Sequence, residues 1–132
     1  MNQFPKEQSG FRPNRGCQEQ VSALTNFIEN GFQKGLKTII VMVDLSAAYD
    51  TIWSKGLIVN FLKMIPSRRI GLLMNDMLSN RMFKVYVNEL TSRWKRLNNG
   101  LPQGSVLAPL LFNIYTSDLP ITQSMKLIYA DD

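Results

Sequence analysis

The stretch Leu127-Ile128-Tyr129-Ala130-Asp131-Asp132 places two adjacent carboxylates directly after a short apolar run. A third carboxylate, Asp44, follows the longer apolar run of residues 38–43. Both runs are typical of buried strands. If the strands lie side by side, their ends bring the three aspartates together as the oxygen ligands that Mg²⁺ prefers. Read separately, Asp131 and Asp132 are only a polar chain end, and Asp44 only begins a turn.

Composition restricts the chemistry to carboxylates and an added cation. The 132 residues include one cysteine, Cys17, and no histidine, which excludes disulfide frameworks, zinc sites and histidine-based triads within this chain. Two metal ions about 3.5–4 Å apart can clamp the attacking and leaving oxygens of an in-line phosphoryl displacement. The net charge of +5 suits a polyanionic partner, although many proteins with this excess bind none.

Four segments have apolar side chains at helical spacing. They cover residues 17–34, 55–65, 67–78 and 105–117. Gly35 and Pro66 are expected to end the first two helices, and Ser67 is placed to cap the third. Pro109 fits the fourth helix if it lies in the first turn.

Strand patterns complete an α+β arrangement. Residues 38–43 are too continuously apolar for a half-exposed strand and fit the centre of a covered sheet, while 125–128 form the strand that carries Asp131 and Asp132. Residues 82–87 alternate and predict a hairpin with 93–97 across the turn at Asn88-Glu89. The fold class is therefore α+β, with a mixed or antiparallel sheet and packed helices.

The hairpin is strongly basic. Against the single Glu89 it carries five cations: Arg81, Lys84, Arg93, Lys95 and Arg96. A ribbon of this charge suits nucleic-acid phosphates. The alternative is an ordinary solvated hairpin face.

Four motifs, in order, resemble those of reverse transcriptases. Residues 43–50, Val-Asp-Leu-Ser-Ala-Ala-Tyr-Asp, resemble the first metal-binding motif, and residues 99–109, built around Pro-Gln-Gly, resemble the second. Residues 129–132, Tyr-Ala-Asp-Asp, look like the third. Upstream, Gln8-Ser9-Gly10-Phe11-Arg12-Pro13 is similar to the Gly-Phe-Arg-Pro element that precedes the first motif in retrotransposons that lack long terminal repeats. The resemblance is to jockey-like elements of arthropods and covers about residues 7–132; intron-encoded reverse transcriptases share the three motifs.

The resemblance implies the palm of a right-hand polymerase and the addition of deoxynucleotides to a primer 3′ hydroxyl. It makes Asp44 and Asp131 shared ligands of two Mg²⁺ ions, with Mn²⁺ as a substitute, and Asp132 the supporting carboxylate. It also assigns contacts with the incoming nucleotide to Leu45, Tyr49, Pro102, Gln103 and Gly104.

Two of the implied contacts have structural alternatives. Tyr49 would lie beneath the incoming sugar and exclude a 2′ hydroxyl, but a tyrosine near a helix start is often a core residue whose hydroxyl is satisfied. Arg12 would touch template phosphate, or it would only brace the loop at Pro13. With Lys84, Arg93, Lys95 and Arg96, it completes the weaker candidates for nucleic-acid binding.

The resemblance also implies other parts and partners: fingers, a thumb and an endonuclease region of a larger polyprotein, an RNA template, a DNA primer and deoxynucleoside triphosphates. Residues 1–16 are predicted as an N-terminal loop segment, and 17–132 as a partial palm truncated at the Tyr-x-Asp-Asp motif. We expect little polymerase activity from this chain alone. The alternatives are an inactive retroelement remnant or a nucleic-acid-binding module.

The sequence offers no sign of export or membrane insertion. No apolar stretch reaches the roughly 18 residues needed to span a bilayer, and residues 1–6 lack the apolar core of a signal peptide. We therefore expect an intracellular protein of the nucleus or cytoplasm that is not secreted and has no membrane partner.

Overall fold

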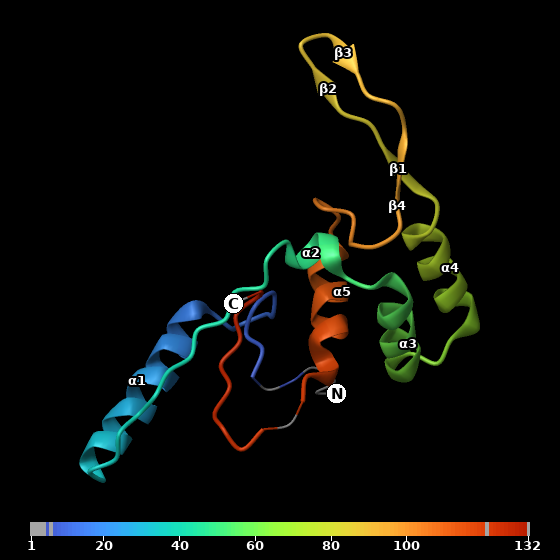
Figure 1. The fold of residues 1–132 in the computed structure, drawn as a ribbon. Coiled ribbons are helices and arrows are strands. Elements are labelled where there is room, and N and C mark those ends of the chain that lie inside the picture. The colour runs from blue at the N-terminus through green and yellow to red at the C-terminus, as the bar shows by residue number, and fades with distance from the viewer. Residues whose placement is uncertain (1–4, 6, 121, 132) are drawn as a thin grey trace. The chain divides into compact units, whose positions relative to one another are not determined.

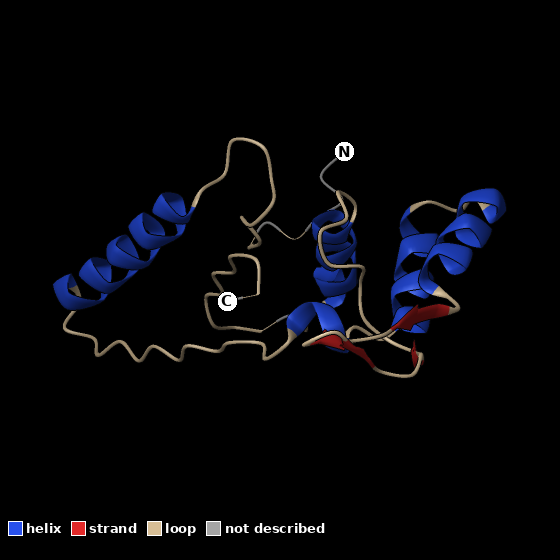
Figure 2. Cartoon of the chain, turned by 90° about the horizontal axis from the view of Figure 1, so that it is seen from above, coloured by secondary structure: helices blue, strands red, loops and turns tan. Residues whose placement is uncertain are grey.

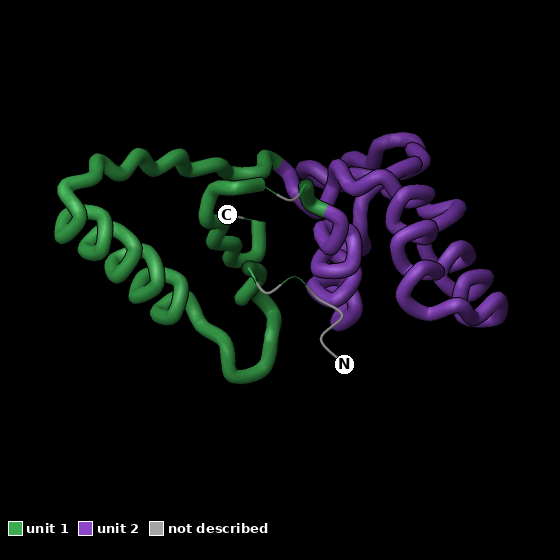
Figure 3. Tube along the Cα trace, turned by 90° about the horizontal axis from the view of Figure 1, so that it is seen from below, with its two compact units in different colours: residues 1–46, 119–132 green, residues 47–118 purple. Residues whose placement is uncertain are grey.

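The computed structural model describes residues 5, 7–120 and 122–131 (Figure 1). The chain divides into two compact units (Figure 3). Unit 1 comprises residues 1–46 and 119–132, and unit 2 comprises residues 47–118. No helix among the described residues is both long and apolar enough to cross a membrane.

Unit 1 contains one long helix, α1 (Cys17–Gln33), which confirms the sequence prediction. Its end is built around Gly35, which has a φ of 66°. The N–H of Gly35 donates to the carbonyl of Phe32 over 3.0 Å, and the N–H of Leu36 donates to that of Gly31 over 2.9 Å. This is the Schellman arrangement that glycine favours. The apolar side of α1 is uncovered in the described residues, because none of its side chains is buried and Phe32 is 70% exposed.

Both strands predicted for unit 1 are wrong for the described residues. Residues 38–43 form a loop in Figure 2, and Ile39 and Met42 are 88% and 87% exposed. Residues 125–128 contribute only an isolated parallel bridge between Ile128 and Gln8. An apolar run indicates a tendency to be buried, whereas a strand also needs a neighbour that pairs with its backbone groups. No described segment pairs along residues 38–43 in that way.

Unit 2 contains four helices and a 3₁₀ turn. These are α2 (Ala48–Thr51), α3 (Ser54–Met64), α4 (Arg68–Leu78), α5 (Ala108–Tyr115) and η1 (Thr116–Asp118). Helix α3 packs against both α4 and α5, and Leu57 of α3 and Phe112 of α5 are buried. Ser67 occupies the N-cap of α4, as predicted, but its side chain makes no cap hydrogen bond. Pro109 lies in the first turn of α5, which confirms that prediction.

A two-stranded antiparallel ribbon extends from these helices in Figure 1. Strand β1 (Arg81–Phe83) pairs with β4 (Lys95–Leu97), and β2 (Tyr86–Val87) pairs with β3 (Leu90–Thr91). Between the two paired regions, residues 84–85 face residues 92–94, so one strand carries an extra residue and the predicted strand 82–87 is interrupted. We call residues 81–97 the basic ribbon. Helices with small antiparallel sheets agree with the predicted α+β class.

The turn of the basic ribbon lies where the sequence placed it. Asn88 and Glu89 have φ values of 44° and 66°. Positive φ at both central residues is typical of the type I′ turn, whose twist matches a two-residue hairpin. This local geometry confirms the predicted hairpin.

Candidate functional site

The segments that carry Asp44 and Asp131 meet within unit 1. The N–H of Leu45 donates to the carbonyl oxygen of Asp131 over 3.4 Å. Asp44 is exposed and Asp131 is half-buried, while Asp132 lies outside the described residues. The backbones that bear two of the three predicted metal ligands are thus adjacent, and the role of their carboxylates remains a prediction.

The donors at this position fit a hard divalent cation. Asp44 and Asp131 provide carboxylate oxygens, which are the ligands that Mg²⁺ and Mn²⁺ prefer. Within residues 5, 7–120 and 122–131, no three aspartate, glutamate, cysteine or histidine side chains gather into a metal-binding group. The pair therefore has suitable chemistry, and the predicted third carboxylate is Asp132.

Gln8 holds the turn that precedes Asp131. Its amide oxygen accepts hydrogen bonds from the N–H of Gly10 over 2.8 Å and from the N–H of Ala130 over 3.1 Å. Its amide nitrogen donates to the carbonyl of Ala130 over 3.1 Å. Ala130 has a φ of 58°, a left-handed conformation that disfavours a non-glycine residue by about 1–2 kcal/mol. The sequence prediction gave Gln8 no role, and its only signal was its place two residues before Gly10 in the segment Gln8-Ser9-Gly10-Phe11-Arg12-Pro13.

Backbone bonds reinforce the same contact. The N–H of Ser9 donates to the carbonyl of Ile128 over 2.9 Å, and the N–H of Ile128 donates to the carbonyl of Glu7 over 3.1 Å. The amide nitrogen of Gln20 reaches Ser9 Oγ and the carbonyl of Glu7. One guanidinium nitrogen of Arg12 donates to the carbonyls of Pro5 and Gln8 over 2.9 and 3.1 Å. These two bonds favour the bracing role for Arg12 over a template contact.

In unit 2, the two residues that precede Pro-Gln-Gly are hydrogen-bonded to helix α2 and to Ile52, the residue that follows it. The N–H of Leu101 donates to the carbonyl of Tyr49 and the N–H of Gly100 to that of Ile52, each over 2.8 Å. Gly100 has a φ of 86°, and a Cβ there would lie 2.8 Å from the carbonyl oxygen of Asp50. The start of the motif can approach the helix this closely because residue 100 is glycine.

Two candidate residues of unit 2, Gln103 and Tyr49, each contact a neighbour within that unit. The amide nitrogen of Gln103 donates to a carboxylate oxygen of Asp50 over 2.8 Å. The ring of Tyr49 stacks on the buried ring of Phe112, with centroids 5.2 Å apart and an interplanar angle of 19°. Tyr49 thus has the packing expected of a core residue, and its predicted contact with a sugar remains untested. Asp50, the last residue of the first motif, lies in the short helix α2 and orients Gln103.

The other two predicted nucleotide contacts of unit 2 flank Gln103. Pro102 is half-buried. Gly104 is exposed with a φ of 80°, and a Cβ there would meet nothing within 4 Å. Leu45, which belongs to unit 1, is 47% exposed. These positions leave their predicted roles as expectations.

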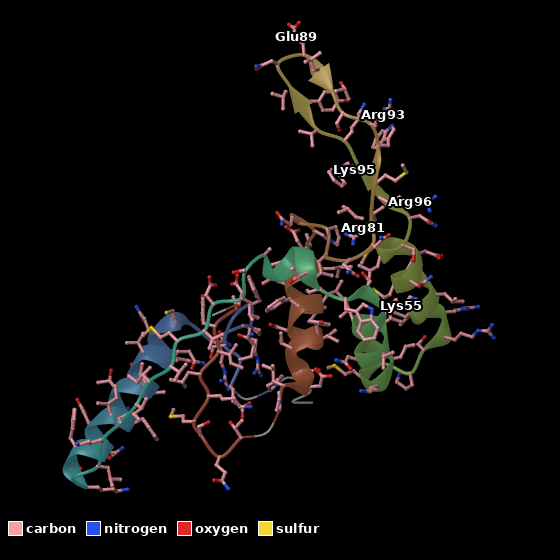
Figure 4. The ribbon with its side chains drawn as sticks, viewed as in Figure 1. Lys55, Arg81, Glu89, Arg93, Lys95 and Arg96 are labelled. Carbon is pink, nitrogen blue, oxygen red and sulfur yellow. The ribbon has the colours of Figure 1, made fainter. Side chains whose placement is uncertain are left out.

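The cations of the basic ribbon have different surroundings. The Arg81 guanidinium donates to the carbonyls of Leu78, Asn99 and Gly100, so it fastens the base of the ribbon. Figure 4 shows Arg93, Lys95 and Arg96 along one strand of the ribbon and Glu89 at its tip. Lys84 Nζ lies 4.7 Å from the ring centroid of Tyr86 and 5.1 Å from that of Trp94.

Comparison with known proteins decides the family. Residues 1–132 match the family described as "Reverse transcriptase (RNA-dependent DNA polymerase)". The chain belongs to the reverse transcriptase family. This confirms the resemblance carried by the four motifs.

Individual relatives agree with this assignment. The chain is 35% identical over 138 residues to the Drosophila melanogaster "Probable RNA-directed DNA polymerase from transposon BS", covering 98% of the chain and 15% of the relative. It is 33% identical over 117 residues to the "RNA-directed DNA polymerase from mobile element jockey" of the same species, covering 89% and 13%. A Schizosaccharomyces pombe "Uncharacterized 91 kDa protein in cob intron" is 33% identical over 117 residues, covering 88% and 13%. The chain therefore spans about 15% or less of the length of these relatives.

Proposed function

We propose that this chain contributes catalytic carboxylates and nucleotide contacts to an RNA-directed DNA polymerase of a retrotransposon that lacks long terminal repeats. In this reaction a primer 3′ hydroxyl attacks the α-phosphorus of a deoxynucleoside triphosphate and pyrophosphate leaves. The Leu45–Asp131 hydrogen bond carries the proposal, because it joins the segments that bear Asp44 and Asp131 in a member of the reverse transcriptase family.

The carboxylates would bind metal ions, and Tyr49 and Gln103 would contact the nucleotide. Asp44 and Asp131 would bind two Mg²⁺ ions, or Mn²⁺ in their place, with Asp132 as the supporting carboxylate. When bound, the ions would favour ionisation of the primer hydroxyl and neutralise the charge that develops on the phosphoryl oxygens. Tyr49 would lie beneath the sugar, and Gln103, oriented by Asp50, would contact the nucleotide and template.

The chain would be one part of a larger protein. It would belong to a polymerase palm, with the fingers, thumb and an endonuclease elsewhere in a larger polyprotein. An RNA template and a DNA primer would be its macromolecular partners. The protein would act inside the cell, in the nucleus or cytoplasm.

Primer extension tests the carboxylates. RNA template, primer, deoxynucleotides and Mg²⁺ are supplied to the native protein that contains this sequence, as wild type, Asp44→Asn and Asp131→Asn. Each substitution should slow extension by about 10³-fold or more, because the charge that stabilises the reacting phosphoryl group is lost. Asp76→Asn, at an exposed position of α4, is the matched control and should extend normally. Extension by Asp44→Asn at the control rate would contradict the proposal.

A second candidate function, nucleic-acid binding, rests on the basic ribbon. Its cations accompany two exposed rings, Tyr86 at 64% and Trp94 at 59% exposure, and Lys84 lies near both. Cations beside exposed aromatic rings suit single-stranded nucleic acid, whose phosphates pair with the charges and whose bases stack on the rings. Lys84, Arg93, Lys95 and Arg96 are the proposed phosphate contacts.

Salt dependence tests the ribbon separately from catalysis. Binding of single-stranded RNA to the 132-residue chain is measured without Mg²⁺ over a series of salt concentrations. Arg96→Met should reduce the slope of log affinity against log salt by about 0.7, the value for one lost phosphate contact with a single strand. Arg69→Met, at an exposed position of α4, removes the same charge elsewhere and should leave the slope unchanged. Equal slopes for both variants would exclude the ribbon as the binding surface.

A further inference from the structure

We propose that Gln8 is a positioning residue for the metal-binding carboxylates, holding Ala130 in the conformation from which the chain presents Asp131. This inference rests on the proposed function, since it assumes that Asp44 and Asp131 bind the cations. Gln8 would touch neither metal nor substrate. Its effect would pass through the backbone of Ala130.

The geometry of the Gln8 amide carries the inference. The side chain is 1% exposed, and both of its polar ends bond the same residue, Ala130, which lies 122 positions away in the sequence. One bond fixes the N–H of Ala130 and the other fixes its carbonyl. Because the two peptide planes flanking Ala130 are both held, the side chain restrains φ and ψ of that residue together.

The backbone around Ala130 is restricted by its own conformation and by the close approach of Gly10. Ala130 has a φ of 58°, which an L-residue with a Cβ rarely adopts without support. Gly10, whose N–H also donates to the Gln8 amide oxygen, lies so close that a Cβ there would approach the Cα of Ala130 to 2.7 Å. The segment around Gln8 and the turn around Ala130 are therefore fitted to each other.

The restraint lies next to the contact that joins the two aspartate segments. Ala130 directly precedes Asp131, whose carbonyl accepts the N–H of Leu45, the residue after Asp44. A continuous path therefore leads from the Gln8 amide to both predicted ligands, through its hydrogen bonds to Ala130, the peptide bond from Ala130 to Asp131, and the hydrogen bond from Leu45 to Asp131. Residues that orient metal ligands in this indirect way typically change metal affinity by 10–100-fold when they are replaced.

The first experiment replaces the polar amide of Gln8 with an apolar side chain of nearly the same length. Gln8→Met is compared with the wild-type 132-residue chain and with Gln33→Met, the same change at an exposed position of α1. The readouts are hydrogen exchange of the Ala130 amide by nuclear magnetic resonance, and Mn²⁺ affinity from the electron paramagnetic resonance signal of the free ion. Gln8→Met should expose the Ala130 amide to faster exchange and weaken Mn²⁺ binding about tenfold, whereas Gln33→Met should change neither.

Two further variants keep the test decisive if Gln8→Met does not fold. Gln8→Glu retains an oxygen that accepts from Gly10 and Ala130 but loses the donor to the Ala130 carbonyl, so the Ala130 amide should exchange faster than in wild type. Gly10→Ala leaves Gln8 intact but places a methyl group against Ala130, and should accelerate exchange by displacing the turn. Unchanged exchange of Ala130 in folded Gln8→Glu and Gly10→Ala would overturn the inference.

Aspartate variants separate this inference from the proposed function. If Asp44→Asn and Asp131→Asn lose Mn²⁺ binding while Gln8→Met keeps wild-type affinity and Ala130 protection, only the positioning role is overturned. If the aspartate variants bind Mn²⁺ as well as wild type, the metal site fails and the positioning role fails with it. Weaker Mn²⁺ binding in Asp44→Asn, Asp131→Asn and Gln8→Met, with binding unchanged in Gln33→Met, supports both the metal site and the positioning role of Gln8.

Discussion

Unit 2 buries a hydrophobic core together with three polar side chains, Ser54, Asn60 and Asn113, whereas unit 1 buries no hydrophobic side chain among its described residues. Every buried hydrophobic residue in the described part of the chain lies in unit 2, including Leu57 at 0% and Phe112 at 1% exposure. The buried side chains described for unit 1 are polar: Gln8 at 1% and Ser9 at 0%. Unit 2 is thus organised by apolar packing, which acts without direction, whereas the centre of unit 1 depends on directional hydrogen bonds.

The largest expected effect comes from breaking the apolar core of unit 2. Phe112→Ala should lower the free energy of unfolding by about 3–5 kcal/mol, because it removes a fully buried ring and leaves a cavity beneath Tyr49. Urea unfolding followed by tryptophan fluorescence reports this unit, since both tryptophans, Trp53 and Trp94, belong to it.

The same substitution in unit 1 provides the control. Phe32, near the end of α1, is 70% exposed, so Phe32→Ala should change the free energy of unfolding by less than about 0.5 kcal/mol, measured by far-ultraviolet circular dichroism. A loss of several kcal/mol in Phe32→Ala would mean that α1 packs on an apolar surface and that the contrast between the units is wrong.

The same contrast explains which elements the sequence predicted. Helices α3, α4 and α5 follow from apolar spacing within single segments, and Asn88-Glu89 is a turn whose geometry is local. The strands predicted over 38–43 and 125–128 depended on neighbours elsewhere in the chain, and an apolar run does not specify a neighbour. Family motifs predicted that the segments of Asp44 and Asp131 meet, but no periodicity predicts that Gln8 bonds a residue 122 positions away.

A smaller effect should follow from disturbing the close backbone contact between Gly100, at the start of the second motif, and Asp50 of helix α2. Gly100→Ala places a Cβ 2.8 Å from the carbonyl of Asp50 at a φ of 86°, and should destabilise the chain by about 2 kcal/mol or more through strain and collision together. Gly104→Ala has a similar φ of 80° but meets nothing within 4 Å, so it isolates the strain, at about 1 kcal/mol. Equal losses in urea unfolding would show that the Asp50 contact is unimportant.

The smallest effect is expected where the sequence predicted a buried strand. Ile39 is 88% exposed in unit 1, and Ile52 is 1% exposed in unit 2. Ile39→Thr should therefore change the free energy of unfolding by less than about 0.5 kcal/mol, since its side chain already lies in water. Ile52→Thr should cost about 2–3 kcal/mol, because it removes buried apolar surface and introduces a hydroxyl group into the core.

The Ile39 result distinguishes two explanations of the exposed run. If both isoleucine variants lose 2–3 kcal/mol in urea unfolding followed by circular dichroism, residues 38–43 are buried in the native protein as a strand would be, and unit 1 has an apolar core like that of unit 2. A loss confined to Ile52→Thr would leave the run exposed in the isolated chain. Its hydrophobic side chains would then contribute nothing to the stability of the fold, and the positions of Asp44 and Asp131 would depend on hydrogen bonds such as those from Gln8.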